Sequence, residues 1–403
     1  MASGTEVAVL GKEERAMSIP EAIYTSSETA KTLIFKQYPS IRVNDILFEH
    51  RVFIRFPGCK TMTTQEPIKF KGAPGSPYTR KMLAYLRYRG IRYELLIGDH
   101  AKSLGMPDAK VGLLPTFYLP RDDGQIEAVV DSTPLIRRLE QEFSGKEALP
   151  SHPVLAFLNY LIEDFADEWL TKSMFHYRWY YEDDIDMAGT ILPMWTGIQA
   201  SSDQLKDMKN YVANRQISRL YVVGSNDLTA PVIEASYVRF LSIMDRLIEK
   251  QLFVLGSRPS SADFAIYAQL TQLAKFDPTP AKICLEQAPR VLAWTDLVDD
   301  LSGNPGLEDD WLSEEDLKQS LKELLDEIGK VYVPALLANA KAIEAGDEEM
   351  SLEIDGKPWK QPIFPYQAKC LEWIREEYRK LGSNGQGQVN AIIDGSGCED
   401  LLT

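Results

Sequence analysis

Cysteine and histidine are scarce in this chain of 403 residues, which contains four of each. The cysteines have neither the short spacing of a metal-binding pair nor the density of a disulfide framework. They are Cys59, Cys284, Cys370 and Cys398. Because such usage fits a reducing compartment, we expect a cytoplasmic protein with no disulfide and no bound metal.

Positive charge and long apolar runs are also lacking. The chain has 44 Lys and Arg residues against 59 Asp and Glu residues, a net charge of −15. No basic stripe with interleaved aromatic residues is present, so we expect no nucleic-acid partner. A run of about 18 apolar residues and a secretory signal peptide are both absent, so we expect a soluble protein without membrane attachment. The length allows two domains with substantial cores.

A Ser-Pro pair behind a short strand is the most informative feature that is present. Residues 69–71 are typical of a strand, a Gly/Pro turn follows, and Ser76-Pro77 opens a helix. The Ser76 hydroxyl can accept from an orphan backbone N–H, and Pro at the first helical position loses nothing by lacking its own. This end of a helix also stabilises an anion. By itself, however, the pattern predicts only a capped helix.

The elements that follow have an informative order. A helix over 81–89 ends at Gly90, a strand is expected over 91–97, and Leu114-Pro115 stands at the edge of the next strand. The sequence Arg-Asp-Asp-Gly at 121–124 predicts a hairpin turn before a strand over 126–130. Asp131-Ser132 then precedes a helix with an apolar stripe. The order is β-α-β, a proline-led hairpin and a helix.

This order and its landmarks resemble the thioredoxin-like domain of glutathione transferases. Ser76-Pro77-Tyr78 is similar to the opening of several bacterial members. Leu114-Pro115 stands where the family has a cis-proline, and Asp131-Ser132 stands where it has a Glu/Asp-Ser pair. The resemblance implies an α/β thioredoxin-like N-terminal domain followed by an all-α glutathione-transferase C-terminal domain.

A second block carries the resemblance into the helical domain. Residues 256–264, Gly-Ser-Arg-Pro-Ser-Ser-Ala-Asp-Phe, are similar to the pattern that starts a buried helix in the family. Ser260 and Asp263 form the expected capping box of that helix, a folding role without chemistry of its own.

The expected domain organisation has four parts. Residues 1–66 do not resemble the family, and we expect a flexible extension or an upstream misassigned start, with Met62 as the alternative one. The thioredoxin-like, glutathione-binding domain spans 67–145, and the all-helical domain spans 151–301. Residues 302–403 form a mostly helical extension, longer than the usual transferase ending but similar to that of some bacterial glutathione-transferase-like proteins. It includes a hairpin around Asp355-Gly356 and a helix over 366–381.

The resemblance implies glutathione as a co-substrate and assigns roles to the matching positions. Leu114 and Pro115 would pair with its cysteinyl backbone at the strand edge. Asp131 would take its γ-glutamyl ammonium, and Ser132 would take the adjacent carboxylate. The alternative for this pair is simple helix capping, and the alternative for Pro115 is an ordinary strand-edge proline.

The thiol of glutathione must ionise to be a good nucleophile. A hydroxyl at a helix N-terminus lowers a thiol's pKa, and the resemblance makes Ser76 the catalytic candidate. Tyr78 is a second candidate, with packing against the helical domain as its more favoured role.

The electrophile is expected between the two domains. An aromatic segment over 169–181 stands where the family builds the wall of an apolar site. Its tentative members are Phe175, Tyr177, Arg178 and Trp179, although aromatic runs more often pack a core or a dimer face.

The expected function is therefore a glutathione-dependent transferase that conjugates or exchanges the thiolate with a small electrophile. Two alternatives stay open: a non-catalytic scaffold that binds a partner, and a glutathione-dependent thiol–disulfide reductase. A homodimer is expected because family members usually pair the two domains between subunits.

Overall fold

The computed structural model describes residues 46–48, 52–54, 66–121, 123–307 and 310–402. The chain divides into two units, residues 1–65 and 66–403. In the first, β1 (Ile46–Phe48) pairs antiparallel with β2 (Val52–Ile54). The remainder of the predicted N-terminal extension lies outside the described residues, and everything below concerns the second unit.

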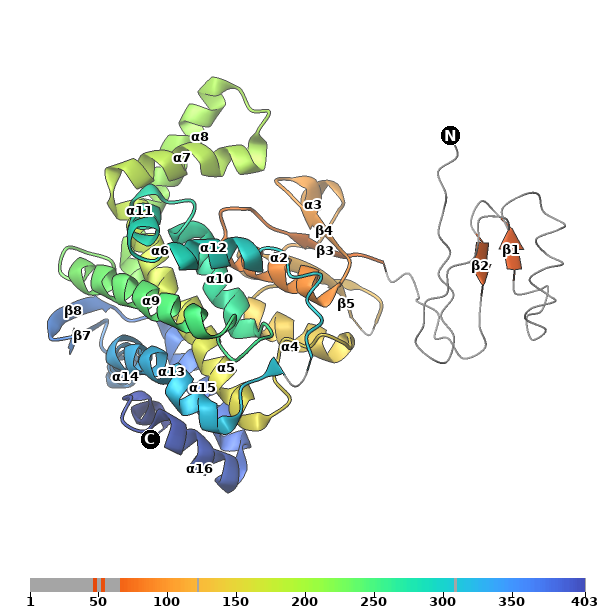
Figure 1. Cartoon of the computed structure of the whole chain (residues 1–403). Helices are drawn as coiled ribbons and strands as arrows, with labels where there is room; N and C mark the ends of the chain where they lie inside the picture. Colours follow the sequence, from red (N-terminus) through yellow and green to blue (C-terminus); the bar gives the residue numbers. More distant parts are fainter. Residues whose placement is uncertain (1–45, 49–51, 55–65, 122, 308–309, 403) are drawn as a thin grey trace, which may run out of the picture. The chain divides into compact units, whose positions relative to one another are not determined.

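The second unit begins with a four-stranded mixed sheet in the order β4-β3-β5-β6 (Figure 1). The central strand β3 (Ile68–Lys71) is parallel to β4 (Tyr93–Leu96) and antiparallel to β5 (Thr116–Pro120). Strand β6 (Ile126–Val129) continues the sheet antiparallel to β5. Three helices accompany the strands: α2 (Pro77–Arg89), α3 (His100–Ser103) and α4 (Ser132–Glu142). This arrangement confirms the predicted thioredoxin-like fold.

Helix α2 starts and ends where the sequence predicts. The hydroxyl of Ser76 accepts from the backbone N–H of Thr79 at 3.2 Å, and Pro77 is the first helical residue. Gly90 ends the helix at a φ of 66°, a left-handed conformation that costs glycine little. The resulting strand–turn–helix unit holds Ser76 next to the edge of the sheet.

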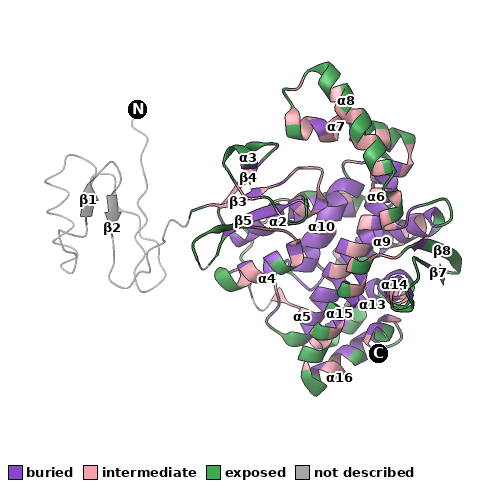
Figure 2. Ribbon diagram, turned by 180° about the vertical axis from the view of Figure 1, so that it is seen from behind, coloured by how far each residue is buried: buried purple, intermediate pink, exposed green. Residues whose placement is uncertain are grey.

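The helical domain follows, and its central helix is buried along its whole length (Figure 2). In this helix, α10 (Ser261–Leu273), the Asp263 carboxylate accepts from the N–H and the hydroxyl of Ser260 at 2.8 and 2.7 Å, which confirms the capping box. The other helices of this domain are α5 (Pro153–Phe165), α6 (Thr171–Tyr180), α7 (Glu182–Gly197), α8 (Ser202–Ile217), α9 (Ala230–Lys250), α11 (Pro278–Gln287) and α12 (Pro289–Val298).

Helices α5 and α6 are joined end to end by a π-helical turn, η3 (Ala166–Leu170). The helix therefore runs without a break from residue 153 to residue 180. A π-helical turn inserts an extra residue into the helix and is frequent at functional sites. Here it carries two acidic residues, Asp167 and Glu168.

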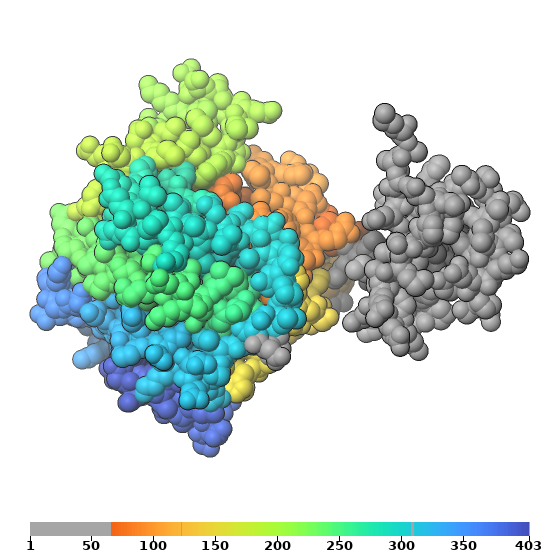
Figure 3. Space-filling view, in the orientation of Figure 1, coloured from red at the N-terminus to blue at the C-terminus, as the bar shows by residue number. Residues whose placement is uncertain are grey.

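The last hundred residues fold onto the helical domain, at the end away from α7 and α8 (Figure 3). Strands β7 (Glu349–Ile354) and β8 (Lys357–Pro362) form the predicted hairpin, with Asp355 and Gly356 at positive φ in its turn. The helices are α13 (Glu314–Glu327), α14 (Val333–Ala345), α15 (Pro365–Lys380) and α16 (Gly382–Ile393). The sequence did not predict α16, because its three glycines disfavour a helix that here is stabilised by packing on α5 and α13.

Candidate functional site

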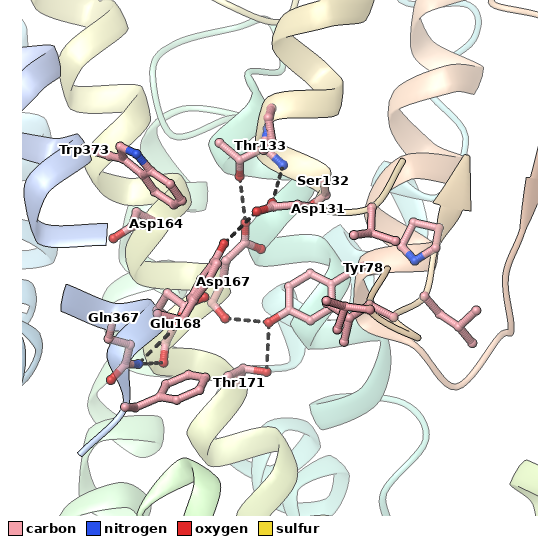
Figure 4. Close-up of a pocket in the computed structure, with 18 of the residues that line it drawn as sticks. Tyr78, Asp131, Ser132, Thr133, Asp164, Asp167, Glu168, Thr171, Gln367 and Trp373 are labelled. Carbon is pink, nitrogen blue, oxygen red and sulfur yellow. Dashed lines mark hydrogen bonds between the residues drawn. The ribbon is translucent and has the colours of Figure 1, made fainter. Parts of the chain in front are cut away.

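A cavity of about 780 Å³ lies where three parts of the second unit meet (Figure 4). The thioredoxin-like domain contributes Tyr78, Leu114, Pro115, Asp131, Ser132 and Thr133. The continuous helix contributes one face, Tyr160, Asp164, Asp167, Glu168, Thr171 and Lys172. Helix α15 and the residue before it contribute Phe364, Tyr366, Gln367, Trp373 and Glu377. The cavity thus brings together most of the predicted glutathione-binding residues and a wall that was not predicted.

The strand edge at Leu114 and Pro115 lines the cavity beside the N-terminus of α2. The peptide bond between these residues is cis, as the resemblance implied. Ser76 lies next to this edge, because its hydroxyl donates to the carbonyl oxygen of Leu114 at 3.2 Å. A hydroxyl, a helix N-terminus and the backbone that leads into β5 therefore converge at one place.

Asp131 lines the cavity in a strained backbone conformation. Its φ is 81°, which is uncommon for a residue other than glycine. One carboxylate oxygen accepts from the backbone N–H of Thr133 at 3.3 Å and caps α4, while the other accepts from the Tyr366 hydroxyl at 2.8 Å. Strain at a cavity wall is typical of functional positions. The expected cap is present, and it leaves the second oxygen facing a tail residue.

Tyr78 connects the two domains across the cavity wall (Figure 4). Its hydroxyl donates to the backbone carbonyl of Asp167 at 2.8 Å and lies 3.4 Å from the hydroxyl of Thr171. Burial, with Glu168 and Asp167 nearby, raises the pKa of Tyr78 well above its usual range. The phenol is therefore neutral at physiological pH, and its bonds are those of a packing residue.

Beneath this wall, a buried ion-pair cluster joins α2 to the continuous helix. The Lys81 ammonium donates to Glu163 at 2.7 Å and to Asp167 at 2.6 Å, and the three side chains are almost fully buried. Burial alone would lower the pKa of Lys81, but Asp167 and Glu163 raise it. Thr133 donates to Glu163 at 3.0 Å and bridges to Asp167 at 3.3 Å. The cluster fixes the position of Asp167 relative to Asp131.

Asp167 is a site residue that the sequence analysis missed. Its Oδ2 atom accepts from Lys81, but its Oδ1 atom is buried and has no hydrogen-bond partner among the described residues. Burial raises the pKa of Asp167 to about 6, so it is ionised at neutral pH. An unsatisfied buried carboxylate oxygen is costly, and this one belongs to a cavity-lining residue. The signal was available, because four acidic residues interrupt the apolar stretch 154–170.

Two further carboxyl groups and one ammonium group occupy the same helix face. Asp164 accepts from the Tyr332 hydroxyl at 2.5 Å, and Glu168 accepts from the Gln367 amide at 3.2 Å. Burial raises the pKa of Asp164 to about 7 and that of Glu168 to about 8. Burial also lowers the pKa of Lys172 to about 8. At pH 7, Glu168 is therefore largely protonated and Asp164 about half protonated, whereas Lys172 keeps its charge.

The four residues expected to form an electrophile wall do not line this cavity: Phe175, Tyr177, Arg178 and Trp179. Tyr177 and Trp179 are buried in the helical domain. The Arg178 guanidinium is buried too, where it donates to Asp277 at 2.9 Å and to the Gly75 carbonyl at 3.0 Å. The part of α6 that reaches the cavity is its first turn, with Thr171 and Lys172. The structure therefore places these side chains in the core, the alternative that the sequence had left open.

Within the described residues, no group of three or more His, Cys, Asp and Glu residues is arranged to hold a metal ion. In the same part of the chain, no helix is both long and apolar enough to cross a membrane.

Comparisons with known proteins identify both domains. Residues 71–147 match the family described as glutathione S-transferase, N-terminal domain, and residues 216–297 match the glutathione S-transferase, C-terminal domain. No curated protein matches the chain. The first match runs from the end of β3 to beyond α4, and the second contains α9, α10, α11 and most of α12.

Several solved structures are similar to parts of the chain. A glutathione transferase family member from Pseudomonas fluorescens pf-5, with two glutathione bound, is 13% identical over 60% of this chain and 95% of its own, with a TM-score of 0.37. A glutathione transferase from Burkholderia graminis, with two glutathione molecules per subunit, is 15% identical over 68% and 92%, with a TM-score of 0.38. The beta-etherase LigF from Sphingobium sp. strain SYK-6 is 17% identical over 60% and 97%, with a TM-score of 0.38.

Proposed function

Because the chain belongs to the glutathione S-transferase family, with both of its domains, we propose that it binds glutathione and transfers the thiolate to a small electrophile. One observation carries the proposal: Leu114, Pro115, Asp131 and Ser132 line one wall of a single cavity, with Ser76 beside them. These groups are of the kinds that an extended peptide with a thiol, an ammonium and a carboxylate requires.

In the proposed complex, the backbone of Leu114 pairs with the cysteinyl residue of glutathione at the strand edge. The carboxylate of the γ-glutamyl group lies at Ser132, at the positive end of α4. Its ammonium lies at Asp131, where it would donate a charge-assisted hydrogen bond in place of the Tyr366 hydroxyl.

The proposed catalytic group is Ser76. Its hydroxyl now donates to the Leu114 carbonyl and would turn to donate to the glutathione sulfur. Together with the positive end of α2, this bond stabilises the thiolate and lowers the pKa of the thiol, whose proton leaves to solvent. The thiolate then forms a bond to the electrophilic carbon, and the leaving group departs with the electron pair of the bond that breaks.

The function is tested with glutathione titration by calorimetry and with thiol addition to a panel of electrophiles. We expect binding at roughly millimolar affinity or tighter, and slower addition in Ser76→Ala than in the wild type. Removing an N-cap costs about 1 kcal/mol of stability by itself. Ser201→Ala, which removes the cap of α8 away from the cavity, is the matched control. Equal rates in Ser76→Ala and the wild type would remove Ser76 from the mechanism.

The Asp131 assignment has a sharper test. Asp131→Asn keeps the cap and tolerates the positive φ, but it deletes the charge. Losing one charge-assisted hydrogen bond should weaken glutathione binding by about one to two decades while the melting temperature barely changes. A glutathione analogue that lacks the α-amino group should bind both proteins equally. Asp131→Ala should also lower the melting temperature by a few degrees, and unchanged glutathione affinity in Asp131→Asn would refute the assignment.

A second candidate function is a non-catalytic scaffold. The observation that favours it is the Tyr366 hydroxyl on Asp131, which occupies the acceptor that glutathione would need. A scaffold should give no heat in the glutathione titration. Reduction of disulfides is the third candidate, and it is less favoured because residue 76 is serine instead of cysteine.

We also propose a cytoplasmic homodimer, on family membership and on the cysteine usage noted above. Light scattering at micromolar concentration tests the assembly. A mass near 45.5 kDa, that of one chain, would overturn the dimer.

A further inference from the structure

Lys172 is a buried ammonium group on the cavity wall without a carboxylate partner. It is 2% exposed, and no carboxylate oxygen of the described residues lies within 4 Å of its Nζ atom. Among the described residues, Nζ donates to the Val223 carbonyl at 3.3 Å and to the Gln361 side chain at 3.4 Å, both long for such bonds. A buried charge is expensive unless a counter-ion pairs with it.

The nearest acidic residue on the same helix face does not neutralise Lys172. Glu168 lies one turn before it, but burial raises the pKa of Glu168 to about 8, and its carboxyl group is bound to the Gln367 amide. Lys172 itself, with a pKa of about 8, is still charged at neutral pH. The cavity wall therefore carries a positive charge that no carboxylate of the described residues pairs with, although the rings of Trp169 and Trp359 lie near it.

A second cation lines the cavity close by. Arg219 precedes the short helix η4 (Leu220–Val223), whose Val222 and Val223 also line the cavity and whose Val223 carbonyl holds Lys172. Within the described part of the chain, the Arg219 guanidinium makes no hydrogen bond or ion pair. Lys172 and Arg219 therefore both lie next to η4, and neither pairs with a carboxylate of the described residues.

The surroundings of this pair are apolar and adjoin the proposed thiol position. Val111, Leu113 and Phe364 line the same cavity, and Leu113 directly precedes the Leu114-Pro115 strand edge. Thr171, one residue before Lys172, lies 3.4 Å from the Tyr78 hydroxyl. A ligand that reaches from the strand edge to Lys172 would cross this apolar surface.

We propose that the second substrate is an apolar electrophile that carries a carboxylate or a similar anionic group, bound by Lys172 and Arg219. The proposal rests on the proposed function and names its substrate class. The apolar body packs against Val222 and Phe364, and the anionic group supplies the missing counter-ion. The anion is held unchanged while the glutathione thiolate displaces the leaving group at the electrophilic carbon.

Equilibrium binding of conjugates tests the substrate class without requiring turnover. The ligands are S-benzylglutathione and its 3-carboxybenzyl and 4-carboxybenzyl analogues, titrated by calorimetry at pH 7 into the full chain. The wild type should bind at least one carboxylated conjugate about tenfold or more tightly than S-benzylglutathione, as one charge-assisted pair predicts. This preference should vanish in Lys172→Met and decrease several-fold in Arg219→Met, while binding of S-benzylglutathione stays the same.

Arg215→Met, which removes an exposed arginine near the end of α8 outside the cavity, is the matched control and should keep the full preference. Arg219 is exposed, so its variant keeps the proposal testable even if Lys172→Met does not fold. Equal affinity of the wild type for all three conjugates, or an equal loss for all three in Lys172→Met, would overturn the substrate class alone. Failure to bind glutathione and S-benzylglutathione would instead overturn the proposed function and this inference with it.

Discussion

The two main walls of the cavity hold their polar groups in different ways. On the thioredoxin-like wall, local caps hold the two helix starts: Asp131 caps the N–H of Thr133, and Ser76 caps that of Thr79. On the wall formed by the continuous helix, the carboxyl groups are bonded by residues far away in sequence, as Asp164 is by Tyr332. Each local cap positions a ligand-binding group and stabilises its helix by about 1 kcal/mol. The buried acidic groups of the helix wall, in contrast, are bonded to distant parts of the chain, so changing one of them should also change the stability of the whole fold.

The largest effect is expected on stability, from breaking the buried ion pairs of Lys81 that join the two walls. Lys81→Met leaves Glu163 and Asp167 buried without their cation, which should lower the free energy of unfolding by about 3–5 kcal/mol. Urea denaturation followed by circular dichroism measures the change. Lys322→Met, which breaks an exposed i,i+4 pair with Asp326, should cost no more than about 0.5 kcal/mol. Similar losses in both variants would mean that the buried cluster does not hold the domains together.

A smaller effect is expected where the tail meets the thioredoxin-like wall. Tyr366→Phe removes the hydrogen bond to Asp131 and should free that oxygen for the glutathione ammonium. One hydrogen bond to a carboxylate, at about 1.5–3 kcal/mol, corresponds to glutathione binding that is about ten- to a hundredfold tighter. Tyr378→Phe, on the same helix but bonded to Asn390, is the control and should leave affinity unchanged. Weaker binding in Tyr366→Phe would instead make the phenol part of the glutathione site.

The smallest expected effect is on how stability depends on pH, and it comes from Glu168 on the helix wall. The pKa of Glu168 is about 8 in the folded state against an ordinary value of 4.5, so folding favours its protonated form. Its contribution to stability is therefore full below pH 4.5 and is lost as the pH rises to about 8. Glu168→Gln, which stays neutral and can still accept from Gln367, should melt near the wild-type temperature at pH 5 and above it at pH 8. Calorimetric scans at both pH values measure the difference.

Glu377→Gln serves as the control for this experiment, because Glu377 lines the same cavity but pairs with Lys380 in a half-buried position. Its melting temperature should follow that of the wild type at both pH values. A Glu168→Gln variant that also follows the wild type at pH 8 would contradict the raised pKa.

Prediction from the sequence was accurate for the elements that local patterns define. Ser76-Pro77 and Gly90 delimit α2, Ser260 and Asp263 cap α10, and Asp355-Gly356 turns the tail hairpin, since caps and turns depend on residues a few positions apart. Helix α16 was not predicted, because its intrinsic preference is poor and its packing partners lie elsewhere in the chain.

The sequence by itself determined the elements that caps, turns and hydrophobic periodicity define, because those depend on residues a few positions apart. Its resemblance to glutathione transferases implied the two domains and the residues of one cavity wall. Tertiary structure decided the rest. In the folded protein, the side chains of Tyr177, Arg178 and Trp179 are buried in the core. Asp167, which lies in a π-helical turn, lines the cavity. Tertiary structure also placed Tyr366 of the tail on Asp131. Which face of a helix meets a cavity depends on how distant helices pack, and no local pattern contains that information.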